Sequence, residues 1–151
     1  MAKKHDIAII GAGNLGIAIA KGISGAKLAK PKNMYLTRRH LEKLDHLKSQ
    51  KFKITSDNKD AVQNSEYIFL CVQPKQLPAV LEEINSVLDP EKHVLISTIT
   101  GVEIAAIEEL LEQTMPVIRA MPNTATAIQE SMTCLCAKNV SDQQLKEVKK
   151  L

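Results

Sequence analysis

The sequence predicts an α/β fold in which a mostly parallel sheet carries helices on both faces. Two observations predict it. Short apolar runs rich in β-branched residues alternate with stretches whose apolar residues recur at helical spacing. The first of these runs, Ile7–Ile10, leads directly into a glycine-rich turn and a helix of small residues. The length of 151 residues is enough for one domain with a substantial core.

Each expected element has a local reason in the sequence. Strands are expected where short apolar runs are bounded by polar residues, glycine or proline: 7–10, 34–37, 53–55, 67–72, 93–99, 117–121 and 132–137. Helices are expected where apolar residues recur every three or four positions: 14–24, 41–47, 59–64, 77–88, 104–111 and 141–151. Gly25 is the expected stop of the first helix, and Ser141 and Gln144 resemble a capping box for the last. No helix of normal length separates the last two strands, which allows an antiparallel edge pair there.

The glycine-rich turn is the most informative segment of the chain. Residues 11–16 read Gly-Ala-Gly-Asn-Leu-Gly, a G-x-G-x-x-G motif that begins where a strand ends. Gly11 permits the tight turn, Gly13 leaves the backbone open to a diphosphate, and Gly16 lets the helix approach the strand. An ordinary glycine-rich turn is the alternative. The context favours a Rossmann-like, doubly wound domain with cofactor contacts at Gly11, Ala12, Gly13, Asn14, Leu15 and Gly16.

The end of the second expected strand indicates which dinucleotide binds. NAD-binding domains of this type carry an acidic residue there for the ribose hydroxyls. Here the sequence is Thr37-Arg38-Arg39, and the first acid after it is Glu42. A hydroxyl and two guanidinium groups suit a 2′-phosphate, which predicts NADP(H), with NADPH preferred over NADH. The alternative is that the arginines only decorate the next helix.

Further contacts are expected at the carboxyl ends of the other strands, where ligands bind in doubly wound sheets. The expected cofactor contacts there are Asn58, Val72, Gln73, Pro74, Thr98, Ile99 and Thr100. Met121, Pro122 and Asn123 are expected beside the nicotinamide and the substrate, although proline followed by asparagine is also common in simple turns. No metal site is expected, because no histidine lies near the three cysteines in sequence, which are interpreted as reduced core residues.

Composition excludes several classes of function. The net charge is only +3, and two Tyr and two Phe provide no basic surface interleaved with aromatics, so nucleic-acid binding is not expected. No apolar run approaches the ~18 residues of a membrane span, and no signal peptide is evident, which predicts a cytoplasmic protein. The four histidines are scattered and expected at the surface, so no catalytic acid or base is assigned.

Taken together, these segments resemble pyrroline-5-carboxylate reductase. The resemblance is carried, in order along the chain, by residues 10–16, 72–74, 96–101 and 117–124, of which Arg119-Ala-Met-Pro-Asn-Thr124 is the most specific. It implies NAD(P)H-dependent reduction of 1-pyrroline-5-carboxylate to L-proline, a step of proline biosynthesis. It also implies that residues 1–151 are the dinucleotide-binding domain, with a helical dimerisation and substrate domain expected after Leu151.

The resemblance further implies that the full-length protein is a homo-oligomer and that the isolated domain is inactive. Two other readings of the sequence stay open. One is another NADP-dependent dehydrogenase, of the β-hydroxyacid or prephenate type. The other is a nucleotide-sensing domain without catalysis, since such modules use the same glycine motif.

Overall fold

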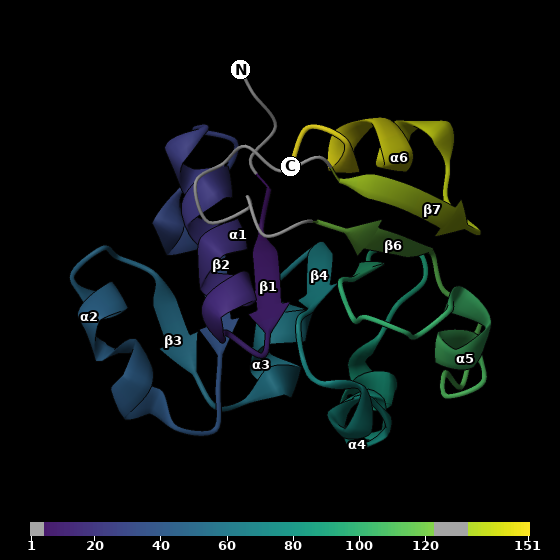
Figure 1. The fold of residues 1–151 in the computed structure, drawn as a ribbon, viewed down its shortest axis with the longest axis horizontal. Coiled ribbons are helices and arrows are strands. Elements are labelled where there is room, and N and C mark those ends of the chain that lie inside the picture. Colours follow the sequence, from purple (N-terminus) through teal and green to yellow (C-terminus); the bar gives the residue numbers. More distant parts are fainter. Residues whose placement is uncertain (1–4, 123–132) are drawn as a thin grey trace.

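The computed structural model describes residues 5–122 and 133–151, which form a single seven-stranded sheet. The strand order across the sheet is β3-β2-β1-β4-β5-β6-β7 (Figure 1). The bounds are β1 Ile7–Ile10, β2 Met34–Thr37, β3 Lys53–Thr55, β4 Tyr67–Leu70, β5 Val94–Ser97, β6 Val117–Met121 and β7 Cys134–Lys138. The predicted α/β class is confirmed, although Met132, the expected start of the last strand, lies outside the described residues.

Pairing is parallel from β3 through β6, and β7 is antiparallel to β6. The chain runs outward from β1 through β2 to β3 and then crosses back to add β4 on the other side of β1. The sheet therefore has its topological switch point between the carboxyl ends of β1 and β4, the place where doubly wound folds bind ligands. The predicted antiparallel edge pair is confirmed.

Alternate residues of each strand supply two separate cores, because successive side chains point to opposite faces of a sheet. Ile7 and Ile9 belong to the core under α1 (Asn14–Gly25), α2 (Asp45–Lys48) and α6 (Asp142–Val148). Ala8 and Ile10 belong to the core under α3 (Asn58–Gln63), α4 (Leu77–Ile84) and α5 (Ile104–Glu108). The predicted cover of helices on both faces is confirmed. No helix in the described part of the chain is long and apolar enough to cross a membrane.

Several helices are shorter than their apolar patterns predict. The stretch 41–47 is a 3-10 helix over Leu41–Leu44 followed by the single turn of α2, and the last helix ends at Val148 rather than Leu151. The helix expected over 77–88 ends at Ile84 and continues as 3-10 helix. The change falls at the buried Asn85, whose Nδ2 donates to the carbonyl oxygen of Leu110 at 3.0 Å.

Other local predictions were wrong. Gly25 is the last residue of α1 and does not stand beyond its end as the helix stop. The left-handed backbone conformation after the helix falls on Lys27 instead, with a φ of 60°. His93 is buried rather than at the surface, because the loop from Asp89 folds back and the Asp89 N–H donates to His93 Nδ1 at 2.9 Å. Cys134 and Cys136 are exposed on β7, which is the edge strand, rather than in the core.

Candidate functional site

The turn between β1 and α1 is shaped by two glycines that the packing requires. Gly11 has a φ of +88°, and a Cβ there would lie 2.7 Å from Val72 Cγ1. A Cβ on Gly16 would lie 2.9 Å from Ile9 Cγ2 and 3.0 Å from the carbonyl oxygen of Gly11. Gly11 therefore brings the turn against the end of β4, and Gly16 brings α1 against β1, as the sequence predicts.

Gly13 is different, because nothing in the described residues explains the absence of its side chain. A Cβ at Gly13 would have no atom within 4 Å, and the backbone φ of −85° is open to any residue. Gly13 is also the N-cap of α1, which has neither a side-chain cap nor an acidic residue in its first turn. The first N–H groups of α1 thus have no side-chain cap and lie beside a backbone that carries no side chain, an arrangement suited to an anion.

The end of β2 is bonded directly to this turn. The backbone N–H groups of Gly11 and Ala12 donate to the carbonyl oxygen of Thr37, at 3.2 and 2.8 Å. Thr37 itself is buried, and its hydroxyl donates to Asn58 Oδ1 at 2.7 Å. Residues far apart in sequence therefore meet at one end of the sheet, and Thr37 lies beneath the site rather than on its surface.

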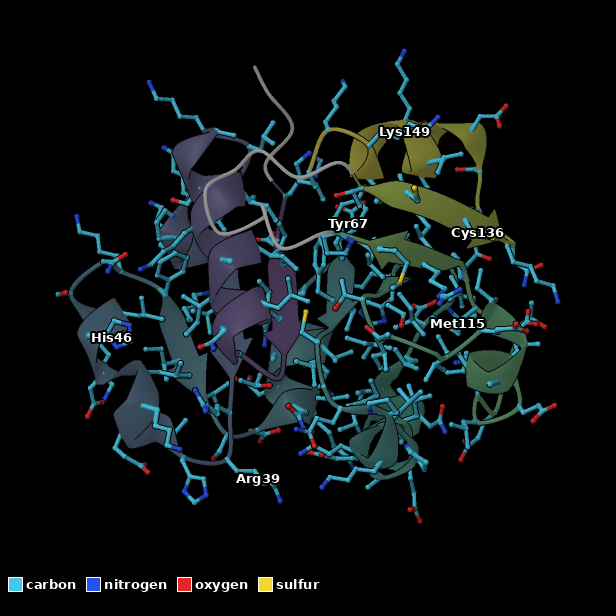
Figure 2. The ribbon with its side chains drawn as sticks, viewed as in Figure 1. Arg39, His46, Tyr67, Met115, Cys136 and Lys149 are labelled. Atoms are coloured by element: carbon cyan, nitrogen blue, oxygen red, sulfur yellow. The ribbon has the colours of Figure 1, made fainter. Side chains whose placement is uncertain are left out.

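The two arginines after β2 differ in position. Arg38 is half-buried, and its Nη1 donates to the carbonyl oxygen of Ala12 at 3.3 Å. Arg39 is exposed and extends into solvent at the edge of the molecule toward which β1 points (Figure 2). The site thus has one guanidinium bonded to the glycine turn and a second one free to reach outward.

Sequence reasoning missed one charged group in this cluster. Glu83, an exposed residue of α4, accepts a hydrogen bond from Asn58 Nδ2 at 2.9 Å. Nothing in the spacing of the sequence indicates this contact. It arises because α3 and α4 pack side by side on the same face of the sheet.

The residues that follow β4 and β5 are partly exposed and partly buried. Val72 packs against Gly11, whereas Gln73, Pro74 and Thr100 are exposed. The other two predicted contacts there, Thr98 and Ile99, are buried. Of the six residues singled out in the glycine turn, Ala12 and Gly16 are buried, Asn14 is exposed, and Gly11, Gly13 and Leu15 are half-buried.

Cys71, between these loops, is a poor nucleophile. Burial raises the pKa of its thiol to about 11, although a hydrogen bond from the Thr98 hydroxyl to Sγ, 3.4 Å long, acts in the opposite direction. The thiol therefore stays protonated at neutral pH. Cys71 serves as a packing residue at the switch point.

A largely apolar pocket of about 720 Å³ lies on the α1 face of the sheet, next to β6 and α6. Its lining includes Ile19 and Gly22 of α1, Thr98 after β5, and Pro122 after β6. Met121, which is half-buried, does not line it, and Asn123 lies outside the described residues. Of the predicted nicotinamide-side residues that the structure describes, Pro122 therefore lines this pocket and Met121 does not.

No candidate for acid–base catalysis lies at the glycine turn among the described residues. His93 stands just before β5, at the opposite end of the sheet from the turn, and burial is the main cause that lowers its pKa. Within residues 5–122 and 133–151, no three His, Cys, Asp or Glu side chains are placed to hold a metal ion.

The switch-point turn, the open amides of α1 and the bonded end of β2 define a Rossmann-type nucleotide-binding domain. Residues 6–101 match the family described as "NADP oxidoreductase coenzyme F420-dependent", and the chain belongs to that family.

Several known proteins are similar to this chain in sequence as well as in fold. Pyrroline-5-carboxylate reductase 2 of Dictyostelium discoideum is 42% identical over 137 residues, which is 89% of this chain and 46% of that protein. A solved pyrroline-5-carboxylate reductase from Coxiella burnetii has a TM-score of 0.90 and 30% identity, over 97% of this chain and 54% of its own. The pyrroline carboxylate reductase from Plasmodium falciparum, solved with NADP bound, has a TM-score of 0.84 and 26% identity, over 98% of this chain and 53% of its own. The chain therefore spans about half the length of these relatives.

Proposed function

We propose that this chain is the dinucleotide-binding part of an NADPH-dependent reductase that converts 1-pyrroline-5-carboxylate to L-proline. The observation that carries the proposal is the open backbone at Gly13, at the start of α1 and beside Arg38. Packing among the described residues accounts for Gly11 and Gly16 but not for Gly13, and a diphosphate that approaches the backbone would account for it. The sequence resemblance and the similarity to pyrroline-5-carboxylate reductases support the substrate.

The residues at the turn fit a dinucleotide diphosphate. The N–H groups of residues 14–16 would bind its oxygens with the help of the helix dipole, and Arg38 and Arg39 would bind the extra phosphate of NADPH. Asn58 would lie at the adenosine end, and Val72, Gln73, Pro74, Thr98, Ile99 and Thr100 toward the nicotinamide. When bound, NADPH supplies the hydride, so the protein's main tasks are to orient two ligands and exclude water.

The substrate side is proposed at the end of β6. Met121 and Pro122 follow Arg119 there, with Asn123 next in sequence. We assign no proton donor in this chain. The relatives are about twice as long as this chain, and we propose that a region corresponding to their remaining half supplies the proton donor and the contacts of a homo-oligomer. A cytoplasmic location stays a prediction of the sequence.

The test is a reduction assay with the protein at its full natural length. Oxidation of NADPH is followed by absorbance while 1-pyrroline-5-carboxylate is supplied, and L-proline is measured as product. Stoichiometric formation of proline supports the proposal. Nucleotide binding without turnover would favour a sensing domain, and turnover only with a β-hydroxyacid or prephenate would favour another dehydrogenase. Either result overturns the reductase assignment.

A further inference from the structure

A carboxylate reaches the β2 end of the site from a distant part of the chain. Glu83 Oε2 accepts from Asn58 Nδ2 at 2.9 Å, and Asn58 Oδ1 accepts the Thr37 hydroxyl proton at 2.7 Å. We propose that Glu83 is a positioning residue, acting through Asn58, that shifts the site away from nucleotides carrying a 2′-phosphate. This inference rests on the proposed function and concerns the cofactor specificity of the same site.

The first step is the orientation of the Asn58 amide. A carboxylate only accepts hydrogen bonds, so Glu83 requires the NH₂ group of Asn58 to face it. The amide oxygen must then face Thr37, as the 2.7 Å bond shows. Without Glu83, the amide is free to turn over and donate to Thr37 instead.

The second step is the consequence for Thr37. Its hydroxyl has one proton, which is committed to Asn58, and its oxygen also accepts from the Gly11 N–H at 3.4 Å. The Thr37 hydroxyl proton is therefore held within the protein, beneath the site. A ribose hydroxyl can donate a hydrogen bond into such a cluster, whereas a phosphate dianion can only accept. Of the side-chain donors in this network, only the second N–H of Asn58 Nδ2 is left for a phosphate. The network therefore adds little to the binding of the extra phosphate for which Arg38 and Arg39 are suited.

The third step is charge. Glu83 brings a negative charge into hydrogen-bond contact with Asn58, which is bonded to Thr37 at the end of β2. Arg38 and Arg39 follow Thr37 directly in sequence. A like charge near the 2′-phosphate weakens its binding, more strongly at low ionic strength. Hydrogen-bond polarity and charge act in the same direction, so Glu83 opposes the arginines in setting the preference between the two nucleotides.

The test compares Glu83→Gln and Glu83→Ala with wild type, using adenosine 2′,5′-bisphosphate and AMP as probes. The probes differ by one phosphate, and their dissociation constants are measured by calorimetry. We expect both variants to raise the affinity for the bisphosphate relative to AMP by about threefold or more at low salt. The matched control is Glu82→Gln, which removes the same charge from an adjacent exposed residue of α4 and should leave the ratio unchanged.

A second readout needs no nucleotide. The side-chain amide signals of Asn58 in ¹⁵N NMR should move in both Glu83 variants and stay in place in Glu82→Gln. A merely structural role would weaken both probes equally and lower the melting temperature. An unchanged ratio of affinities, or unchanged Asn58 signals, overturns this inference alone. A wild-type protein that binds neither probe overturns it together with the proposed function.

Discussion

At the scale of single residues, the three glycines of the motif have different reasons to be glycine. Contacts within the protein require glycine at positions 11 and 16, whereas a Cβ added at Gly13 would meet no atom of the described residues within 4 Å. The sequence pattern predicts all three roles because each follows from the geometry of a strand, a turn and a helix. It could not reveal Glu83, whose contact with Asn58 depends on the packing of two helices.

Alanine at these positions separates stability from binding. Gly13→Ala is expected to leave the free energy of unfolding unchanged and to weaken NADPH binding, because the new methyl group occupies the space beside the α1 amides. Gly16→Ala is expected to lower the free energy of unfolding by about 1–3 kcal/mol, since its Cβ would crowd Ile9. Urea unfolding and calorimetric titration of both variants provide the check. A Gly13→Ala protein that binds NADPH like wild type contradicts this account of the turn.

His93 makes stability depend on pH. Burial, followed by the nearby Lys92, lowers its pKa from 6.5, while Asp89 acts in the opposite direction. The neutral form of His93 is therefore favoured in the folded protein. Its contribution to the free energy of unfolding is complete above pH 6.5 and is lost as the pH falls toward the lower pKa of the folded state.

The expected result is a smaller free energy of unfolding at pH 5.5 than at pH 7.5. In His93→Gln this difference should shrink, even though the variant is less stable at both values. Urea unfolding at the two pH values measures it, and an equal pH dependence in wild type and variant would refute the assignment.

At the scale of elements, strands are predicted more accurately than helices. The apolar runs of β1, β2 and β6 have the expected bounds, because a buried parallel strand is continuous in its hydrophobicity. The short edge strand β3 also has its expected bounds, although it is not buried. Helix lengths depend on tertiary contacts as well as on the apolar pattern. Asn85, where α4 gives way to 3-10 helix, donates to the carbonyl oxygen of Leu110, a contact that a 3.6-residue pattern does not report.

The capping box of α6 is both predicted and present. Ser141 Oγ accepts from the Gln144 N–H at 3.2 Å, and Gln144 Oε1 accepts from the Ser141 N–H at 2.9 Å. Ser141→Ala is therefore expected to lower the free energy of unfolding by about 1 kcal/mol. The exposed Ser49, which donates only to the carbonyl oxygen of His46, is the control, and Ser49→Ala should have a smaller effect. Equal effects in thermal unfolding would show that the cap contributes nothing.

At the scale of the whole molecule, the strand order determines where a ligand binds. The reversal between β1 and β4 brings the glycine turn, the end of β2 and the loops after β4 and β5 to one edge of the sheet. The alternation of strands and helices is enough to predict this arrangement. It is not enough to predict the apolar pocket on the α1 face, which depends on how β7 and α6 pack beside α1.

A ligand that binds only the folded protein must also stabilise it. NADPH at about 100 times its dissociation constant is expected to add about 2.7 kcal/mol to the free energy of unfolding. Differential scanning calorimetry should show a melting temperature that rises with NADPH concentration. The control is Gly13→Ala, in which the rise should require more NADPH; a wild-type melting temperature that is independent of NADPH would be inconsistent with a site at the switch point.

The central claim is that the amides at the start of α1 hold a dinucleotide diphosphate beside Gly13. Isothermal titration of NADPH into the purified 151-residue chain tests it most directly. The account predicts saturable binding of one NADPH per chain, weakened in Gly13→Ala. Absence of binding, or equal binding by the Gly13→Ala protein, would contradict it.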